Sequence, residues 1–266
     1  MKDVAISPDG VPIYYETQGT GQPALVFVHG WSCDRSYWER QVGHFAHQYQ
    51  VVAIDLAGHG ESGLNRQAWT MPAFGEDVVA VVEKLGLEQV VLIGHSMGGA
   101  VIVEAARRMP DRVVGLVGVD TFRNVGQTWT REQIDKILGP FRANFVEATQ
   151  KFVRTMFIPE SNYALVERTV DDMSATPPEV GIGAMEGTLT NDLNLITSLQ
   201  GLKAPVIAIN SDYRPNDLEA AQRYGVRVVF ISGVGHFVMM QDAETFNSLL
   251  EGVIKEFVGA EVIEGV

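Results

Sequence analysis

The hydrophobic residues of the chain follow two kinds of pattern. The first is a continuous run of apolar, largely β-branched residues, which is typical of strands buried on both faces of a parallel sheet. Such runs lie at 24–28, 51–54, 90–93, 113–119, 206–209 and 226–231. The second pattern has apolar residues three and four positions apart, and it predicts helices at about 36–48, 72–85, 98–109 and 243–257. Because the two patterns alternate along the chain, we expect a doubly wound, mostly parallel sheet of the α/β class.

The first residues of the chain carry a different pattern. Apolar and polar positions alternate at about 2–7 and again at 11–17, and a Pro-Asp-Gly turn separates the two segments. Pro and Gly each favour the backbone angles of a tight turn, so this arrangement predicts a β-hairpin. With the hairpin included, the sequence predicts a sheet of eight strands.

A long interval in the second half of the chain breaks the alternation. Residues 121–202 contain no strand-like run, and their apolar residues recur at helical spacing. We expect these residues to form a helical cap inserted between strands 6 and 7, with a core domain made of 1–120 and 203–266. Such a cap would cover the carboxyl edge of the sheet, where open α/β sheets bind their ligands.

The composition excludes several classes of function. A chain of 266 residues with 46% hydrophobic residues can bury a large core. Its net charge of −13 opposes binding to nucleic acid or to anionic membranes, so we expect neither as a partner. The single cysteine, Cys33, excludes an intrachain disulfide and a cysteine-built metal site, and we expect no metal. No apolar stretch approaches the roughly 18 residues that span a bilayer, and the first residues do not resemble a signal peptide, so we expect a soluble, cytoplasmic protein. The oligomeric state is not indicated.

The most informative motif is Gly94-x-Ser96-x-Gly98, between the strand-like run at 90–93 and an alanine-rich helical pattern. A strand, a sharp turn and a helix in this order hold a serine at the apex of the turn in a strained, exposed conformation. The two glycines let the strand and the helix pass close together. Ser96 is therefore the candidate nucleophile.

Acyl transfer through a serine also needs a base and backbone donors for the developing oxyanion. The base is expected after the last strand, where His236 lies between Gly235 and Phe237. One oxyanion donor is expected after the third strand, where the amide of Trp31 follows a glycine. The amide of Met97, directly after the candidate nucleophile, is the second donor.

With these motifs in this order, the chain resembles an α/β-hydrolase-fold protein over essentially its whole length. The resemblance rests on His29-Gly30-Trp31, the glycine-rich loop at 55–62, the turn at 94–99, and Gly235-His236-Phe237. It implies a helical cap and a cofactor-free serine hydrolase. We interpret the loop at 55–62 as shaping the fold beside the pocket, although it holds Asp, His and Glu together.

The carboxylate that would orient His236 is less clearly marked. In most of that family it follows strand 7, nine residues after a proline, but here that position is Arg214. Asp212 and Asp217 lie seven and twelve residues after the proline. Some family members carry the acid after strand 6, where this chain has Asp120. We take Asp120 as the first candidate and Asp212 as the alternative, with Asp217 third.

The substrate pocket is expected to be apolar and to admit a small ester-like molecule. Its candidate lining residues are Trp31, Met97 and Phe237 beside the catalytic motifs, and Phe141, Phe145 and Met156 in the cap. Three cap arginines could either bind a substrate carboxylate or lie on solvated helix faces. They are Arg123, Arg142 and Arg154.

These features together favour a hydrolase of small carboxylic esters that works through an acyl-enzyme and requires no cofactor. The resemblance also allows a lactonase, a thioesterase, a hydrolase of C–C bonds, or a cofactor-free haloperoxidase or perhydrolase. A candidate from another class is a non-catalytic receptor that keeps the pocket and binds a small ligand.

Overall fold

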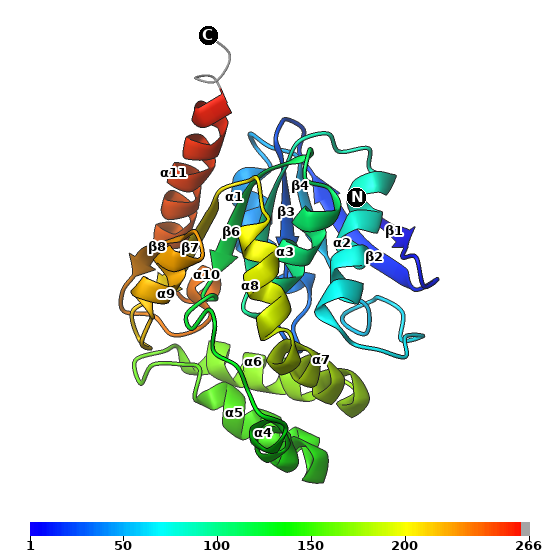
Figure 1. Ribbon diagram of the computed structural model, residues 1–266, viewed down its shortest axis with the longest axis vertical. Coiled ribbons are helices and arrows are strands. Elements are labelled where there is room, and N and C mark those ends of the chain that lie inside the picture. The colour runs from blue at the N-terminus through cyan, green and yellow to red at the C-terminus, as the bar shows by residue number, and fades with distance from the viewer. Residues whose placement is uncertain (262–266) are drawn as a thin grey trace.

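The protein is built on a single eight-stranded sheet with helices on both faces (Figure 1). A computed structural model describes residues 1–261, with side chains described except at 192–194, 260 and 261. The strands are β1 (Lys2–Ile6), β2 (Pro12–Gln18), β3 (Ala24–Val28), β4 (Val51–Ile54), β5 (Val90–His95), β6 (Val113–Val119), β7 (Val206–Ser211) and β8 (Val226–Ile231).

The strands follow the order β1-β2-β4-β3-β5-β6-β7-β8. β1 and β2 form an antiparallel hairpin and β2 also pairs antiparallel with β4, whereas all the remaining pairs are parallel. The predicted doubly wound, mostly parallel eight-stranded sheet is therefore confirmed. Every residue of β3, β4 and β5 is buried, which accounts for their continuous apolar runs.

The sheet changes its winding direction at its centre, because the chain passes from β3 to β4 on one side and then returns to β5 on the other. Ligands of open α/β sheets bind beyond the carboxyl ends of the strands at such a point. Val28 at the end of β3 pairs with Gly94 near the end of β5. The loop that follows Val28 therefore lies beside the turn that carries Ser96.

Two layers of helices cover the sheet. One face packs against α1 (Glu39–Phe45) and α11 (Ala243–Glu261), and the other against α2 (Met71–Lys84) and α3 (Met97–Arg108) (Figure 1). A further helix, α8 (Asp192–Gln200), packs on α3. The fit is close at Gly115 of β6, where a Cβ atom would lie 2.2 Å from the ring of Phe257 on α11. Short helices η1 (Arg35–Trp38), α9 (Leu218–Arg223) and α10 (Val238–Gln241) complete the core.

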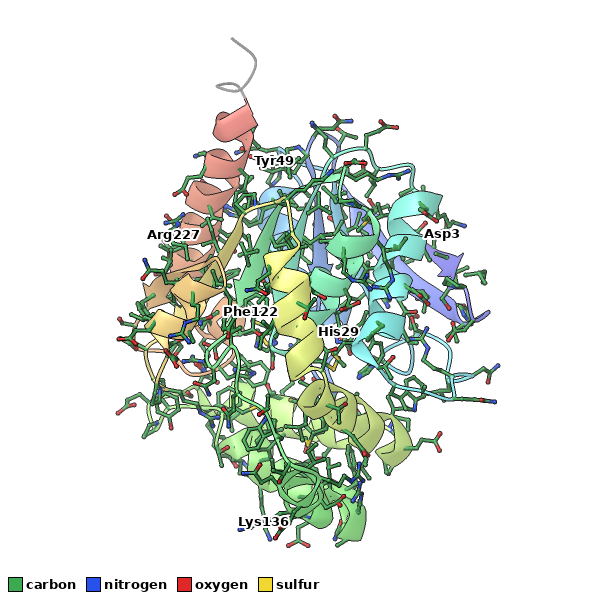
Figure 2. The ribbon with its side chains drawn as sticks, in the orientation of Figure 1. Asp3, His29, Tyr49, Phe122, Lys136 and Arg227 are labelled. Atoms are coloured by element: carbon green, nitrogen blue, oxygen red, sulfur yellow. The ribbon has the colours of Figure 1, made fainter. Side chains whose placement is uncertain are left out.

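Four helices between β6 and β7 gather at one end of the molecule, and we call them the cap helices (Figure 1). They are α4 (Arg131–Ala143), α5 (Phe145–Arg154), α6 (Tyr163–Ser174) and α7 (Pro178–Thr190). Their starts follow local signals, such as the capping box of Thr130 and Gln133 on α4 and the Asn144 side chain at the start of α5. Side chains extend from these helices and from the core into the region where the two meet (Figure 2). The next helix, α8, returns to pack beside α3, and the division of the chain into domains at 121 and 202 stays a prediction.

Candidate active site

The turn at Ser96 joins β5 to α3 with almost no space between them. Ser96 has φ 53° and ψ −116°, a conformation that is strained for a residue with a side chain. A Cβ atom at Gly94 would lie 2.3 Å from the Gly98 carbonyl oxygen, and one at Gly98 would lie 2.6 Å from the His29 carbonyl oxygen. Only glycine at both positions permits this packing, which holds the Ser96 side chain at a cavity above the strand ends.

His236 lies in the loop after β8, and both of its backbone polar groups are bonded. Its amide donates to the Met156 carbonyl at 2.8 Å, and its carbonyl lies 3.0 Å from Nε2 of His95. Since a carbonyl can only accept, His95 donates from Nε2. Burial, together with the nearby His236, lowers the pKa of His95 to about 3, so this ring stays neutral. These contacts fix the position of the His236 ring in the same cavity as Ser96.

Asp120 is the carboxylate beside His236, with 2.5 Å between its Oδ2 and Nδ1 of the imidazole. Its other oxygen accepts a 2.8 Å hydrogen bond from the Ser211 amide and a further one from Arg123. Burial by itself would raise the pKa of Asp120. The hydrogen bond and charge of His236, the charge of Arg123 and the Ser211 amide outweigh burial and hold this pKa below its usual value. The carboxylate is therefore ionised and held from both sides.

The two other candidate acids have different partners. Asp212 is exposed and accepts a 2.6 Å hydrogen bond from the hydroxyl of Ser232. Asp217 caps α9 by accepting from the Ala220 amide at 2.9 Å. Neither carboxylate is hydrogen-bonded to His236 in the described part of the chain, so of the three candidates only Asp120 is brought to it.

The two candidate oxyanion donors, the amides of Trp31 and Met97, belong to residues on either side of the candidate nucleophile in the same cavity. Both residues line the cavity, and neither amide has a hydrogen-bond acceptor among the residues that the structure describes. Met97 begins α3, whose dipole favours negative charge at this end. Gly30 lets the loop approach the turn, because a Cβ there would lie 3.2 Å from Cβ of Ser96.

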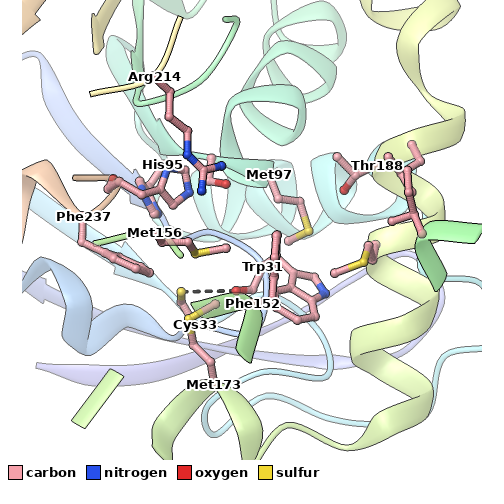
Figure 3. Close-up of a pocket in the computed structure, with 15 residues that line it drawn as sticks. Trp31, Cys33, His95, Met97, Phe152, Met156, Met173, Thr188, Arg214 and Phe237 are labelled. Atoms are coloured by element: carbon pink, nitrogen blue, oxygen red, sulfur yellow. Dashed lines mark hydrogen bonds between the residues drawn. The ribbon is translucent and has the colours of Figure 1, made fainter. Parts of the chain in front are cut away.

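The hydroxyl of Ser96 makes no hydrogen bond to His236 within residues 1–261. In serine enzymes without a bound substrate such contacts are often long, and they tighten when the substrate binds. Both side chains line one cavity of about 280 Å³, which lies between the strand ends and the cap helices (Figure 3). The candidate nucleophile, the candidate base and the two residues with candidate donor amides thus line one cavity.

The walls of this cavity are largely apolar. Of the predicted lining residues, Trp31, Met97, Met156 and Phe237 line it. The further lining residues are Cys33, His95, Ile137, Phe152, Met173, Met185, Thr188, Leu189 and Arg214. Helical spacing marks the aromatic and methionine residues among these as buried, but it cannot distinguish a pocket wall from a packed core.

Phe141 and Phe145 require a correction, because they do not line the cavity. Their rings pack edge-on against Trp31 with centroid distances of 5.8 and 6.1 Å. The Trp31 ring is also anchored by a 2.7 Å hydrogen bond from its Nε1 to the Gly181 carbonyl. The two phenylalanines therefore support a lining residue instead of contacting a substrate.

The three cap arginines named as possible carboxylate ligands have protein partners instead. Arg123 pairs with Asp120, Arg154 with Glu167, and Arg142 with Asp135 and Glu186. None of them lines the cavity that holds Ser96 and His236. The arginine that lines this cavity is Arg214, which occupies the sequence position where most of the family carries the acid.

The glycine-rich loop at 55–62 has a structural role in this fold. The buried carboxylate of Asp55 accepts from the amides of Arg35 at 2.8 Å and Glu61 at 2.9 Å. Burial raises the pKa of Asp55 to about 6 despite these contacts. The loop is held by its own hydrogen bonds, and Asp55 does not line the cavity.

Two features of the described residues bear on membrane and metal binding. Within residues 1–261 no helix combines the length and the apolar character needed to cross a bilayer. The described residues also contain no cluster of three or more His, Cys, Asp or Glu side chains placed to hold a metal ion.

The fold and the arrangement around Ser96 define an α/β hydrolase, a class of enzyme that acts on ester bonds. The chain belongs to the alpha/beta hydrolase family, whose model matches residues 25–249. The resemblance inferred from the four motifs is thereby confirmed.

Several known proteins resemble this chain. It is 26% identical to 3-oxoadipate enol-lactonase 2 of Acinetobacter baylyi, over 97% of this chain and 98% of that protein. It is 39% identical over 113 residues to a non-heme chloroperoxidase of Streptomyces lividans, covering 41% of each chain. Among solved structures, a thermophilic esterase from Thermogutta terrifontis matches with a TM-score of 0.84 and 23% identity, over 97% of this chain and 99% of that one. This last likeness concerns the fold alone.

Proposed function

We propose that the protein hydrolyses small carboxylic esters through an acyl-enzyme, with Ser96 as nucleophile, His236 as base and Asp120 as orienting acid. The observation that carries the proposal is the 2.5 Å contact between Nδ1 of His236 and Asp120. This contact fixes the tautomer in which Nδ1 holds the proton, and it leaves the lone pair of Nε2 for the hydroxyl of Ser96.

In the acylation step, Nε2 of His236 takes the hydroxyl proton as Oγ of Ser96 bonds to the ester carbonyl carbon. The carbonyl π electrons move to the oxygen, and the amides of Trp31 and Met97 donate hydrogen bonds to that oxyanion. When the tetrahedral species collapses, the bond to the alcohol oxygen breaks and His236 returns its proton to the departing alcohol. The acyl group is then bonded to Ser96.

Deacylation repeats the same steps with water as nucleophile. His236 takes a proton from water, the hydroxide adds to the acyl carbonyl, and the same two amides hold the second oxyanion. Collapse releases the carboxylic acid and returns the proton to Oγ of Ser96. Asp120 keeps its charge throughout and stabilises the imidazolium that forms in each step.

The cavity supports a small, largely apolar substrate, because it measures about 280 Å³ and is walled mainly by aromatic and methionine side chains. Lactones are a second candidate class, since they are cyclic esters and the relative similar over 97% of this chain is named an enol-lactonase. The same chemistry opens a lactone ring without releasing an alcohol.

The test compares wild type with Ser96→Ala, Asp120→Asn and Asp212→Asn on p-nitrophenyl butyrate and γ-butyrolactone. Ser96→Ala should abolish turnover, and Asp120→Asn should lower kcat by about 10⁴. Asp212→Asn is the matched control, because it removes the same charge from an exposed carboxylate near the site, and it should keep kcat within about threefold of wild type. A larger loss for Asp212→Asn than for Asp120→Asn, with both proteins folded, would reject the assignment of the acid.

The same panel separates the enzyme from a ligand receptor. A receptor would leave wild type as inactive as Ser96→Ala on every ester and lactone, while a small carboxylic ester still raised the melting temperature. Turnover that disappears in Ser96→Ala excludes that alternative.

A further inference from the structure

One charged side chain faces the cavity that holds Ser96 and His236. Among the described lining residues, Arg214 alone carries a fixed charge, and none is a carboxylate. It lies in the loop after β7, and its side chain extends toward the space that the lining residues surround (Figure 3). Because Arg214 is exposed and also lines the cavity, its guanidinium lies at the opening.

The position of Arg214 is fixed by its neighbours. Its carbonyl accepts hydrogen bonds from Nη1 of Arg123 at 2.8 Å and from Nδ2 of Asn216 at 3.0 Å. Its own Nη2 donates to the Thr155 carbonyl at 2.7 Å and lies 3.3 Å from the hydroxyl of the same residue. The loop from the core and the end of α5 therefore hold the guanidinium between them.

Arg214 has donor capacity that the protein does not use. Its Nη2 is bonded, but Nε and Nη1 have no hydrogen-bond acceptor, and no carboxylate pairs with it in the described part of the chain. The cap arginines Arg142 and Arg154 differ in this respect, since both are paired with carboxylates. A guanidinium keeps its charge at every pH of interest and presents its donors in a fork that matches a carboxylate.

The charge of the whole protein makes such a local cation informative. With a net charge of −13, the protein repels anionic molecules at long range. An unpaired arginine at the opening of an apolar cavity reverses this preference locally. A neutral ester can offer it a carbonyl oxygen but no opposite charge, so a carboxylate gains more from this arginine.

We propose that the substrate carries a free carboxylate besides the ester or lactone bond, and that Arg214 binds this carboxylate while Ser96 attacks the carbonyl. The inference rests on the proposed hydrolase function and narrows it to half-esters or lactones of short dicarboxylic acids. The carboxylate takes no part in bond breaking. Arg214 is thus a specificity-determining residue, which forms with the carboxylate a hydrogen-bonded ion pair that a neutral ester cannot form.

The test uses two esters that differ only in this group, monoethyl glutarate and ethyl pentanoate, with hydrolysis followed by pH-stat. The selectivity is the kcat/KM for monoethyl glutarate divided by that for ethyl pentanoate. The free energy of a hydrogen bond to a charged group corresponds to a factor of roughly ten or more in binding affinity. Arg214→Gln should therefore lower the selectivity by at least about tenfold, mainly by raising the KM for monoethyl glutarate. Arg214→Lys, which keeps the charge but loses the fork, should give an intermediate value.

Arg154→Gln is the matched control, because it removes the same charge from α5 at a residue outside the cavity. It should leave the selectivity within about twofold of wild type, since the exposed Arg154 charge is already paired with Glu167 and is screened by solvent. An equal loss for both esters in Arg214→Gln would mean that the residue only maintains the pocket. That result, or an unchanged selectivity, would overturn the proposal.

A binding measurement separates this proposal from the hydrolase proposal. Calorimetry with monoethyl glutarate compares Ser96→Ala with the double variant Ser96→Ala/Arg214→Gln, in which no turnover can occur. Binding that is weakened about tenfold by the second substitution supports carboxylate recognition even if wild type hydrolyses neither ester. Equal binding, or no binding to Ser96→Ala, overturns it, whatever the turnover result.

Discussion

Lowering the pH from 7 to 5 should destabilise this fold, because three of its histidines are buried in the neutral form. His29 accepts a 3.0 Å hydrogen bond from the Leu56 amide at Nε2 and contacts the Gly30 carbonyl through Nδ1. Burial lowers its pKa to about 4. Burial also lowers the pKa values of His59 and His95 to about 3, and a neighbouring histidine adds to the effect at each.

The size of the effect follows from the protons bound by each state. An unfolded histidine binds its proton near pH 6.5, whereas these three bind theirs in the folded protein only near pH 3 to 4. Between these values the unfolded state holds more protons, so the stability falls as the pH falls. As the pH falls from 7 to 5, each histidine lowers the free energy of unfolding by about 2 kcal/mol, which makes about 6 kcal/mol for the three.

Two buried carboxylates act in the opposite direction. Burial raises the pKa values of Asp55 and Asp77 to about 6, even though Arg66 pairs with Asp77. The folded protein therefore gains these protons before the unfolded chain does, and together the two aspartates contribute about 3 kcal/mol of stability as the pH falls from 7 to 5. The net expected loss is about 3 kcal/mol, a large share of the 5 to 15 kcal/mol that is typical of a folded domain.

Urea unfolding at pH 7, 6 and 5 measures this loss, and two variants assign it. His59→Gln should reduce the loss of unfolding free energy between pH 7 and pH 5 by about 2 kcal/mol. The reason is that glutamine binds no proton in either the folded or the unfolded state. His47→Gln serves as the matched control, because it makes the same replacement at an exposed histidine. A free energy of unfolding that stays level or rises from pH 7 to pH 5 would refute the neutral, buried state of these rings.

Two further substitutions and one chemical reagent test three other features of the structure. Gly94→Ala should lower the free energy of unfolding by about 1 to 3 kcal/mol and remove most of the esterase activity, because the added Cβ would meet the Gly98 carbonyl. Thermal unfolding measures the stability, and hydrolysis of p-nitrophenyl butyrate measures the activity. Arg123→Gln should raise the pKa of Asp120, because it removes a positive charge beside the carboxylate. A ¹³C NMR titration of the carboxyl group measures this pKa, and an unchanged value would contradict the prediction. Cys33 should react with iodoacetamide far more slowly in the folded protein than in urea, because burial raises its pKa; equal rates would contradict its burial.

The central strands could be predicted from the sequence because every residue of β3, β4 and β5 is buried. The edge strand β8 is partly exposed, and its β-branched and aromatic residues mark it instead. The runs at 24–28 and 226–231 match β3 and β8 residue for residue. The predicted helix at 36–48 is instead a 3₁₀ turn at 35–38 followed by α1, since the side chain of Asp34 caps the turn by accepting from the Ser36 amide. The short helices α9 and α10 contain too few residues for a helical period to be visible.

The lining of the pocket was harder to predict for a physical reason. A cap helix packs one apolar face on its neighbours and turns another toward the cavity, and both faces have the same spacing in the sequence. Phe145 and Phe152 lie seven residues apart on the same helix, yet only Phe152 lines the cavity while both pack against Trp31. The side on which each ring lies depends on contacts with Trp31, which are distant in the sequence.

The choice between the acids depends on the same kind of distant contact. β6 and β7 are adjacent parallel strands with Val119 opposite Ile209, so the residues that follow the two strands emerge side by side. Carboxylates in either position have access to the same imidazole, and the sequence could therefore not decide between them. In the structure the Ser211 amide, at the end of β7, donates to the carboxylate of Asp120, at the end of β6. The loop after β7 thus donates a hydrogen bond to the candidate acid, and in our proposal a later residue of that loop, Arg214, binds the substrate carboxylate.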